Sequence, residues 1–397
     1  MNPRLDLLQP YPFEKLRKLF SGVTPNSALR PINLSIGEPK HPTPRFIRDA
    51  LAAHLDGLAS YPQTVGRESL RMAIADWLTR RYGIASIDPA SQIIPTLGSR
   101  EALFALAQAV LDSDEHDALV VCPNPFYQIY EGATLLAGAK PHFISTTAET
   151  GLRMDWSSVP ADVWRRVRLV FTCSPDNPTG SVMTLDEWRE LFALSDRYGF
   201  VIAADECYTE IYFDDSRPPM GALEAAHKLG RETYPRLVVL GSLSKRSNVP
   251  GMRSGFAAGN AELIRKFTLY RTYHGSAMSP AVQAASEAAW SDEAHVRDNR
   301  RLYREKFDAF YEIVNPVLPL ARPQASFYYW VATPFDDQDF AVRLLHEANV
   351  SVLPGSYLGR EVNGINPGRN HVRIALVSTV EESAEAARRI KSFIENR

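Results

Sequence analysis

Three polar side chains in this chain of 397 residues each follow a short apolar run, and their chemistry is complementary. Asn177 supplies an amide, Asp205 a carboxylate and Lys245 an amine. A lysine amine can form an imine with an aldehyde cofactor, and a carboxylate can keep a pyridine nitrogen protonated. The protonated ring would draw electrons from the Cα of a bound amino acid and ease the loss of its proton. Taken singly, each residue also fits a turn, a helix cap or a solvated loop, so the prediction depends on the three together.

Two further segments have the donors that a phosphate needs. Arg253, eight residues after Lys245, can offer a bidentate guanidinium fork. Gly98, Ser99 and Arg100 stand where a helix is expected to begin, and the free N–H groups of a helix N-terminus bind anions. We therefore expect a phosphorylated aldehyde cofactor to be held between these two segments.

The elements that must position these residues alternate between strand and helix. Nearly continuous apolar runs, typical of strands covered on both faces, predict strands at 118–122, 169–173, 200–204 and 237–240. A helix is expected at 99–111, and a capping box of Thr184 and Glu187 begins another that Gly199 ends. This alternation predicts a mainly parallel sheet with right-handed crossovers. Ligands bind beyond the carboxyl ends of such strands, where the amide, carboxylate and amine stand.

The alternating pattern fades after about residue 290, where an α+β pattern begins. The helices and strands expected there are helices at 297–313, 338–348 and 379–395 and strands at 326–331 and 371–376, joined by a strand from 32–36. Because the chain is longer than one core usually supports, we expect two domains. The predicted limits are 46–290 for a large cofactor-binding domain, and 1–45 with 291–397 for a small domain that includes an N-terminal arm.

Composition and charge argue against several functional classes. The formal net charge is −2 and no block of Lys or Arg appears, so we expect no nucleic-acid partner. The chain begins without an apolar signal region, and its apolar runs are too short for a bilayer, so we expect a cytoplasmic protein without a membrane anchor. Cys122, Cys173 and Cys207 lack the spacing of a zinc site or disulfide framework, and we expect free thiols and no metal.

Eight short segments, in order and with compatible spacing, resemble the class I/II aminotransferases of the fold-type-I pyridoxal-phosphate enzymes. They lie at 35–39, 61–66, 98–102, 125–130, 177–180, 205–208, 242–245 with Arg253, and 371–374. The resemblance covers nearly the whole chain. It implies an α/β fold, with a three-layer α/β/α large domain around a mainly parallel sheet and a smaller α+β domain. It also implies pyridoxal 5′-phosphate as the cofactor, and amino and oxo acids as the substrates of a two-stage ping-pong reaction.

The resemblance implies a role for each residue near the cofactor ring. Lys245 would carry the cofactor as a Schiff base and later move a proton between the substrate Cα and the cofactor. Asp205 would pair with the pyridine nitrogen, while Tyr208 and Asn177 would bind the phenolic oxygen of the ring. Tyr127 would stack on the ring, although an aromatic residue of this kind also fits a hydrophobic core. The catalytic residues implied are Lys245, Asp205 and Tyr208.

The resemblance also implies how phosphate and substrate are held. It assigns four residues to the cofactor phosphate: Ser99, Arg100, Ser242 and Arg253. Tyr61 would reach the phosphate of a neighbouring subunit, which implies a homodimer with shared active sites. Arg373 would bind the substrate α-carboxylate, helped by Asn177 and the backbone of Gly37, although an arginine in a strand also fits a surface position.

Three segments, 8–15, 33–42 and 242–253, resemble more narrowly the N-succinyldiaminopimelate aminotransferases of proteobacteria. This implies amino transfer between N-succinyl-LL-2,6-diaminopimelate and 2-oxoglutarate, in the synthesis of diaminopimelate and lysine. Such substrates carry several carboxylates, and three further arginines are candidates for binding them: Arg30, Arg67 and Arg246. Relatives that act on aspartate, aromatic amino acids or N-acetylornithine share the catalytic residues and stay open as alternatives.

One motif is also compatible with a different chemistry. Ser242 and Lys245 form Ser-x-x-Lys, the nucleophile signature of penicillin-binding proteins and β-lactamases. The chain lacks the Ser-Asp-Asn and Lys-Thr-Gly elements of that chemistry, so acyl transfer is the remote alternative. Lyases and decarboxylases of the same fold type share Asp205 and Lys245, but the presence of Arg373 together with Asn177 favours transamination.

Overall fold

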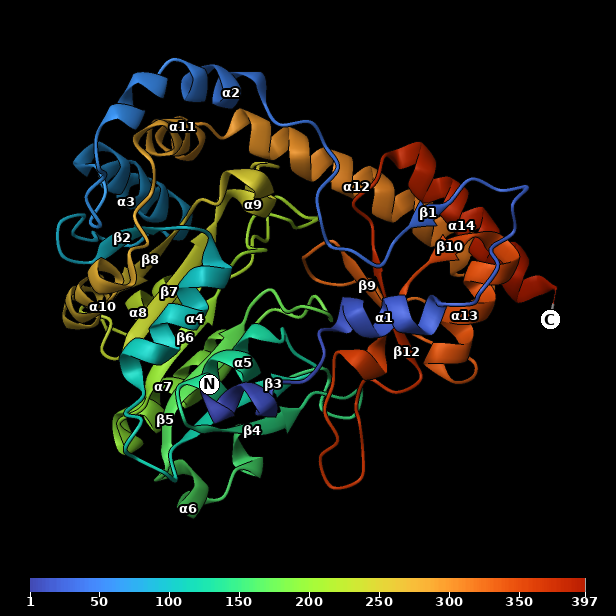
Figure 1. Cartoon of the computed structure of the whole chain (residues 1–397), viewed down its shortest axis with the longest axis horizontal. Coiled ribbons are helices and arrows are strands. Elements are labelled where there is room, and N and C mark those ends of the chain that lie inside the picture. The colour runs from blue at the N-terminus through green and yellow to red at the C-terminus, as the bar shows by residue number, and fades with distance from the viewer. Residues whose placement is uncertain (397) are drawn as a thin grey trace.

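Seven strands form one large sheet within residues 1–396, the part of the chain that the computed structural model describes (Figure 1). Their order across the sheet is β2 (Ile93–Thr96), β8 (Gly255–Gly259), β7 (Leu237–Ser242), β6 (Val201–Asp205), β5 (Val167–Cys173), β3 (Leu119–Asn124) and β4 (Lys140–Ser145). The strands from β7 to β4 in this order run parallel to one another, and β8 is antiparallel to both of its neighbours. The mainly parallel sheet predicted from the sequence is confirmed.

Helices cover both faces of this sheet. One face carries α3 (Glu68–Tyr82), α7 (Leu185–Tyr198), α8 (Ala222–Lys228) and α11 (Pro280–Ser291), and the other carries α4 (Ser99–Val110), α5 (Ile129–Leu136) and α10 (Ala261–His274). Successive strand residues face opposite layers, so Ile202 belongs to the first core and Ala203 to the second. Because both faces are apolar, the parallel strands read as continuous hydrophobic runs. The result is a three-layer α/β/α arrangement.

The ends of α7 follow local sequence signals. The Thr184 hydroxyl accepts a hydrogen bond from the Glu187 N–H at 3.3 Å, and the Glu187 carboxylate accepts one from the Thr184 N–H at 2.8 Å. Gly199 ends the helix in the left-handed conformation, with a φ of 84°. The capping box and the stop predicted from the sequence are both confirmed.

A second group of strands and helices packs around its own hydrophobic core. It contains an antiparallel sheet of β9 (Tyr328–Ala332), β12 (His371–Ala375) and β11 (Leu353–Pro354), and the parallel pair β1 (Ile32–Asn33) and β10 (Val350–Ser351). Its helices are α12 (Ala294–Val314), α13 (Asp337–Ala348) and α14 (Val380–Glu395) (Figure 1). The N-terminal segment supplies a strand here, as expected, although the strand is shorter than 32–36. The domain limits given above stay predictions.

The N-terminal segment bridges the two groups of elements. η1 (Pro3–Leu7) packs against α5, and α1 (Pro12–Phe20) packs against α13 (Figure 1). Leu16 of α1 packs with Leu353 and Leu358, which fixes the segment beside β11. The remaining short helices are α2 (Arg45–Ala52), α6 (Ala161–Trp164), α9 (Leu243–Arg246), η2 (Leu55–Ala59), η3 (Trp156–Ser158), η4 (Pro250–Met252) and η5 (Gly355–Tyr357).

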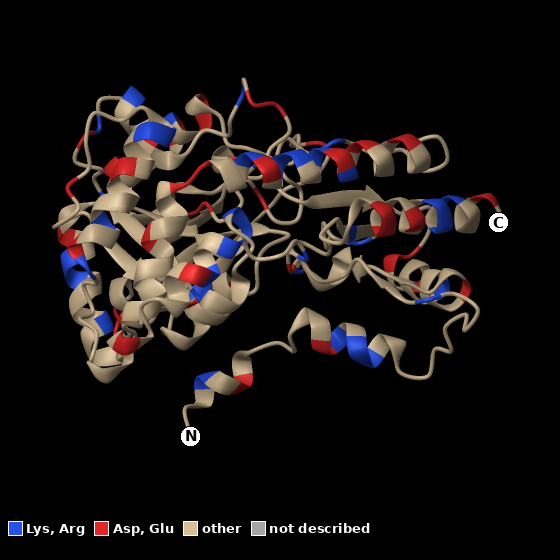
Figure 2. Cartoon of the chain, turned by 90° about the horizontal axis from the view of Figure 1, so that it is seen from above, with Lys and Arg blue, Asp and Glu red and all other residues tan. Residues whose placement is uncertain are grey.

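Positive and negative side chains are interspersed along the outer helices (Figure 2). No helix among residues 1–396 is both long and apolar enough to cross a bilayer. The same residues contain no group of three or more His, Cys, Asp or Glu side chains placed to hold a metal ion. Cys122 and Cys173 are buried and Cys207 is partly buried, all three as free thiols.

Candidate active site

A cavity of about 460 Å³ lies where the carboxyl ends of β5, β6 and β7 meet the N-terminal segment and β9, β11 and β12. Almost all of the site residues predicted from the sequence line it: Gly37, Ser99, Arg100, Tyr127, Asn177, Asp205, Tyr208, Ser242, Lys245, Arg253 and Arg373. They come from segments as far apart in the chain as residues 37 and 373. The fold therefore brings together a set of groups that the sequence only suggested.

Tyr61, which was predicted to bind the cofactor, does not line this cavity. Its side chain is fully exposed, at 103% relative accessibility, and it stands in the loop after η2. A side chain so exposed can contact another molecule. The expectation that it reaches the phosphate of a neighbouring subunit stays a prediction.

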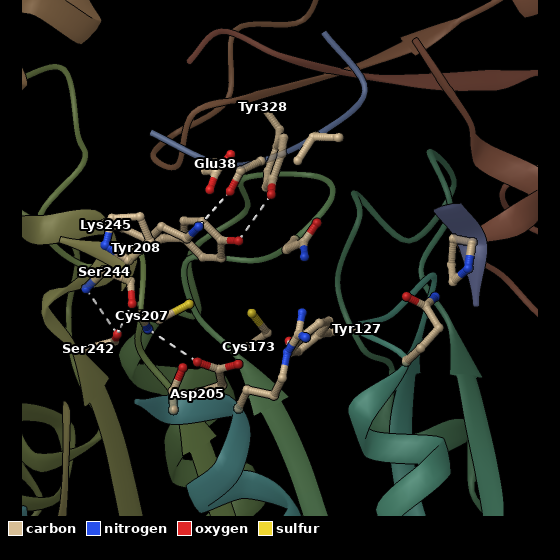
Figure 3. A pocket seen from close by; sticks show the side chains of 18 of the residues that line it. Glu38, Tyr127, Cys173, Asp205, Cys207, Tyr208, Ser242, Ser244, Lys245 and Tyr328 are labelled. Atoms are coloured by element: carbon tan, nitrogen blue, oxygen red, sulfur yellow. Dashed lines mark hydrogen bonds between the residues drawn. The ribbon is translucent and has the colours of Figure 1, made fainter. Parts of the chain in front are cut away.

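The Lys245 amine points into the cavity from α9, directly after β7 (Figure 3). Its Nζ donates a hydrogen bond to the Gly37 carbonyl oxygen at 2.5 Å and lies 5.3 Å from the centre of the Phe327 ring. Burial disfavours the ammonium form and lowers the pKa of Lys245 to about 8. An amine of this kind is a better nucleophile and proton acceptor near neutral pH than an ordinary lysine.

The Asp205 carboxylate closes the bottom of the cavity in the view of Figure 3, at the end of β6. Asp205 is 2% exposed and accepts hydrogen bonds from the Tyr130 hydroxyl at 2.9 Å and the Cys207 N–H at 3.2 Å. It forms no ion pair with Lys, Arg or His within residues 1–396. Burial raises the pKa of Asp205. A buried carboxylate without a cation is well suited to accept a hydrogen bond from a protonated ring nitrogen.

A cradle of donors suited to phosphate forms between β7, α4 and η4. The Ser242 hydroxyl donates to the Ser244 hydroxyl at 3.0 Å, and Arg253 donates to the Pro250 and Leu97 carbonyl oxygens at 2.9 and 3.2 Å. Gly98 precedes α4 with a φ of 81°, and a Cβ there would lie 2.3 Å from the Arg253 guanidinium. Glycine is therefore required for the close approach of Arg253 to the start of the helix.

Arg373 is a buried member of the site, so its interpretation as a surface residue is wrong. It is 4% exposed and donates to the Asn177 side-chain oxygen at 3.0 Å and to the Ser35 carbonyl oxygen at 2.9 Å. Its Nε has no hydrogen-bond partner within the described residues. A guanidinium that lines the cavity beside an amide, without a carboxylate partner in the described residues, is suited to bind a carboxylate.

The Arg100 side chain lies on the Tyr127 side of the cavity. Its Nε donates to the Tyr127 hydroxyl at 2.5 Å and its Nη2 to the Tyr11 hydroxyl at 3.4 Å, with the guanidinium over both rings. The Arg253 guanidinium lies instead at the start of α4, where it donates to the Leu97 carbonyl oxygen. Tyr127 faces the cavity, as stacking on a ring would require.

The three arginines expected to bind distal carboxylates do not line the cavity. Arg246 is buried at 2% exposure and donates to the Ala289 carbonyl oxygen and the Glu293 carboxylate, so its assignment is wrong. Arg30 pairs with Glu382 at 3.5 Å on the exterior. Arg67 stands at the N-cap position of α3 without a side-chain capping hydrogen bond and is exposed. In the sequence, an arginine that forms a structural ion pair cannot be distinguished from an arginine that faces a ligand.

Several residues that line the cavity were not predicted as site residues from the sequence: Tyr11, Phe13, Glu38, Cys173, Cys207 and Tyr328. Tyr328 stands in a stretch that reads as an ordinary strand. Tyr11 and Phe13 belong to segment 8–15, which resembles a family segment but gave no role for these two side chains. Cys207 follows Asp205 by two residues, a spacing that places both at the end of β6. That spacing was a signal available in the sequence.

Residues 30–390 match the aminotransferase class I and II family, so the chain belongs to this family of pyridoxal-phosphate-dependent enzymes. It is 33% identical to an LL-diaminopimelate aminotransferase of Syntrophobacter fumaroxidans (strain DSM 10017 / MPOB) over 98% of both chains. A solved aminotransferase structure from Neisseria meningitidis Z2491 is 52% identical, with a TM-score of 0.96 over 99% of this chain and 100% of that one. A probable N-succinyldiaminopimelate aminotransferase from Thermus thermophilus is 28% identical, with a TM-score of 0.83 over 96% and 98%. The chain thus has the fold-type-I architecture.

The residues present in the cavity fit pyridoxal phosphate. The free amine of Lys245 can bind its aldehyde, and the buried Asp205 carboxylate lacks a cation that a protonated pyridine would supply. The cradle around Arg253, which can approach the start of α4 because Gly98 has no side chain, suits its phosphate. When bound, the cofactor supplies an electron-withdrawing ring that stabilises negative charge at the substrate Cα.

Proposed function

We propose that this enzyme transfers an amino group between N-succinyl-LL-2,6-diaminopimelate and 2-oxoglutarate, in the synthesis of diaminopimelate and lysine. One observation supports a substrate with several carboxylates. Besides Arg253 in the phosphate cradle, Arg373 and Arg100 both face the cavity, and neither has a carboxylate partner within residues 1–396. Two such guanidinium groups suit a substrate with an α-carboxylate and a distal carboxylate.

A second candidate substrate is LL-diaminopimelate without the succinyl group. The 33% identical relative named above acts on it, to judge by its name, and several further relatives at 28–33% identity have the same name. The resemblance of segments 8–15, 33–42 and 242–253 and the similarity to the Thermus thermophilus protein favour the succinylated substrate. Both candidates share a diaminopimelate backbone and differ in whether the distal nitrogen is acylated.

Each catalytic residue has a proposed task at a named atom. Lys245 Nζ takes the proton from the substrate Cα and returns it, since burial leaves its pKa near 8. The Asp205 carboxylate holds a proton on the pyridine nitrogen of the cofactor. Tyr208 and Asn177 donate hydrogen bonds to the phenolic oxygen, and Tyr127 packs on the ring. Because one set of groups serves both half-reactions, the two substrates bind in turn.

We propose that the guanidinium groups of Arg373 and Arg100, which have no carboxylate partner within residues 1–396, both bind the substrate. Arg373 binds the α-carboxylate with its guanidinium group, while Asn177 and the backbone of Gly37 complete this subsite. Arg100 binds the distal carboxylate, since its guanidinium is held by Tyr127 and Tyr11 rather than by an acid. In this proposal the Arg100 side chain contacts the substrate, and the Arg100 backbone N–H binds the cofactor phosphate.

We also propose that the enzyme is a homodimer. Large apolar side chains are exposed on η2, on the loop that follows it and on α10: Leu55, Leu58, Tyr61, Leu269 and Tyr273, each at least 51% accessible. Exposed apolar groups of this size are typical of surfaces that a partner covers. In such a dimer Tyr61 would reach the phosphate cradle of the partner subunit.

A panel of half-reactions tests the proposed substrate. Holoenzyme is mixed with one amino acid at a time, and the change in its visible absorbance and the released oxo acid are measured. N-succinyl-LL-2,6-diaminopimelate and glutamate should react, and N-acetylornithine, aspartate and phenylalanine should react far more slowly. Reaction of LL-diaminopimelate alone would replace the first candidate by the second. A requirement for both substrates at once would contradict the ping-pong scheme.

The distal subsite is tested with Arg100→Gln. The variant should raise the KM for 2-oxoglutarate roughly tenfold or more and leave that for pyruvate, which has no distal carboxylate, within about twofold. Equal losses for both oxo acids, with loss of cofactor, would show that the side chain binds phosphate instead.

A further inference from the structure

Tyr328 contacts three separate parts of the cavity from the first residue of β9 (Figure 3). Its hydroxyl lies 3.2 Å from the Tyr208 hydroxyl. Its ring lies under the Arg373 guanidinium, 4.3 Å from the ring centre. The same hydroxyl also occupies the place of a side chain at Gly37, where a Cβ would lie 1.9 Å from it. One side chain thus touches groups proposed to bind cofactor, substrate and the catalytic amine.

The pairing of β9 with β12 explains the contact with Arg373. Arg373 stands opposite Trp330 in this antiparallel pair, and Tyr328 stands opposite Ala375. Tyr328 and Arg373 are therefore diagonal neighbours on one face of the sheet, within reach of a long and an aromatic side chain. Both are nearly buried, at 2% and 4% exposure, so the attraction between guanidinium and ring is little weakened by solvent.

The number of protons decides the direction of the hydrogen bond between the two tyrosines. A hydroxyl has one hydrogen, so a Tyr208 that donates to the phenolic oxygen of the cofactor must accept from Tyr328. Within residues 1–396 the Tyr328 hydroxyl has Tyr208 as its hydrogen-bond partner and is free to donate to it. Burial raises the pKa of Tyr328, which keeps this proton in place at neutral pH. A hydroxyl that accepts a hydrogen bond becomes a stronger donor.

We propose that Tyr328 is a positioning residue that holds Arg373 for the substrate carboxylate and strengthens Tyr208 as a donor to the cofactor. This inference rests on the proposed function, which assigns Arg373 and Tyr208 their ligands. The two effects come from different parts of the side chain. The ring acts on Arg373 and the hydroxyl acts on Tyr208, so substitutions can separate them.

The role of the Tyr328 hydroxyl in strengthening Tyr208 as a donor is tested by following the visible absorbance of holoenzyme as a function of pH. A donor to the phenolic oxygen stabilises its deprotonated form and lowers the pH of the spectral transition. Tyr208→Phe should raise this pH, and Tyr328→Phe should raise it by a smaller amount, about a few tenths of a pH unit. The matched control is Tyr329→Phe, whose hydroxyl lies 3.4 Å from the Phe307 carbonyl oxygen outside the cavity. It should leave the transition unchanged.

The role of the Tyr328 ring in holding Arg373 is tested by measuring the KM for the amino donor. Tyr328→Phe keeps the ring and should leave this KM within about twofold, whereas Tyr328→Leu should raise it roughly fivefold or more. The spectral titration of Tyr328→Phe stands by itself if the leucine variant does not fold.

The outcomes separate this inference from the proposed function. A shift in Tyr208→Phe without a shift in Tyr328→Phe overturns the tyrosine pair alone. No shift in either variant overturns the assignment of Tyr208 as well. An equal shift in Tyr329→Phe shows a general packing effect and also overturns the inference.

Discussion

The Lys245 amine donates a hydrogen bond to the Gly37 carbonyl oxygen, 2.5 Å away. Gly37 belongs to the N-terminal part of the chain, whereas Lys245 follows β7, so the contact closes the cavity across the two groups of elements. Burial of the amine in this place lowers the pKa of Lys245 to about 8. The fold therefore gives Lys245 an amine that loses its proton more easily than an ordinary lysine does.

The lowered pKa predicts how cofactor uptake depends on pH. Only the unprotonated amine attacks an aldehyde, and at pH 7 roughly a tenth of a group with pKa 8 is unprotonated, far more than for an ordinary lysine. The rate of uptake by the enzyme without cofactor should rise with pH up to about 8 and then level off. Stopped-flow absorbance after addition of pyridoxal phosphate measures this rate, with a free lysine derivative as reference. A rate that rises steadily beyond pH 10 would contradict the prediction.

Gly98→Ala should weaken cofactor retention. The new Cβ would lie 2.3 Å from the Arg253 guanidinium, at a φ of 81° that side chains rarely adopt. Arg253 must move out of the phosphate cradle, so we expect the Kd for pyridoxal phosphate to rise roughly tenfold or more. Equilibrium dialysis measures the Kd. The control is Gly83→Ala, which also has a positive φ but meets nothing within 4 Å and should change only stability.

Asp205→Ala should lower kcat roughly a hundredfold or more, because the ring nitrogen loses its charged partner. Asp205→Glu keeps the charge and should retain more activity than the alanine variant. Steady-state kinetics of both variants, with cofactor content measured by absorbance, separate loss of turnover from loss of cofactor. Near-normal turnover of a fully loaded Asp205→Ala enzyme would show that another group protonates the ring.

Lys306, which lies outside the active site, makes the folding stability depend on pH. Its side chain is fully buried with no hydrogen-bond partner in residues 1–396, and burial lowers its pKa to about 7. The unfolded chain binds this proton up to about pH 10.5, so folding stability rises with pH between about 7 and 10.5. Lys306→Met should raise the unfolding free energy by about 1–2 kcal/mol at pH 7 and by less at pH 9.5.

Urea unfolding at the two pH values measures this effect. The control is Lys391→Met on the exposed side of α14, where the lysine forms a 3.8 Å ion pair with Glu395. It should change stability little at either pH. A Lys306→Met variant that is less stable than the parent at pH 7 would show that the amine is held by favourable contacts.

Local patterns were enough to predict the ends of the central strands. Asn177, Asp205 and Lys245 follow strands whose residues are apolar on both faces, and such strands read clearly in a sequence. β4 and β8 were not predicted, because Lys140–Ser145 mixes polar and apolar residues and Gly255–Gly259 is made largely of small ones. Both are recognised only by the neighbours with which they pair.

Contacts between distant segments could not be predicted. Arg246 resembles a ligand-binding charge in the sequence, but Trp77 and Trp290 cover it and Glu293 pairs with it. Tyr328 reaches Arg373 only through the register of β9 against β12. These relationships depend on tertiary packing, which no local pattern encodes.

The assignment of Lys245 as the residue that carries the cofactor is tested by mapping the covalent attachment site. Holoenzyme is reduced with borohydride, which fixes the cofactor on the amine that carries it, and is then digested with trypsin and examined by mass spectrometry. A pyridoxyl phosphate group is expected on Lys245, within a peptide from residue 237 to 246 because the modified lysine resists cleavage. Lys245→Ala should lose this label. A label on another lysine, or none on Lys245 in a fully loaded enzyme, would show that Lys245 does not carry the cofactor.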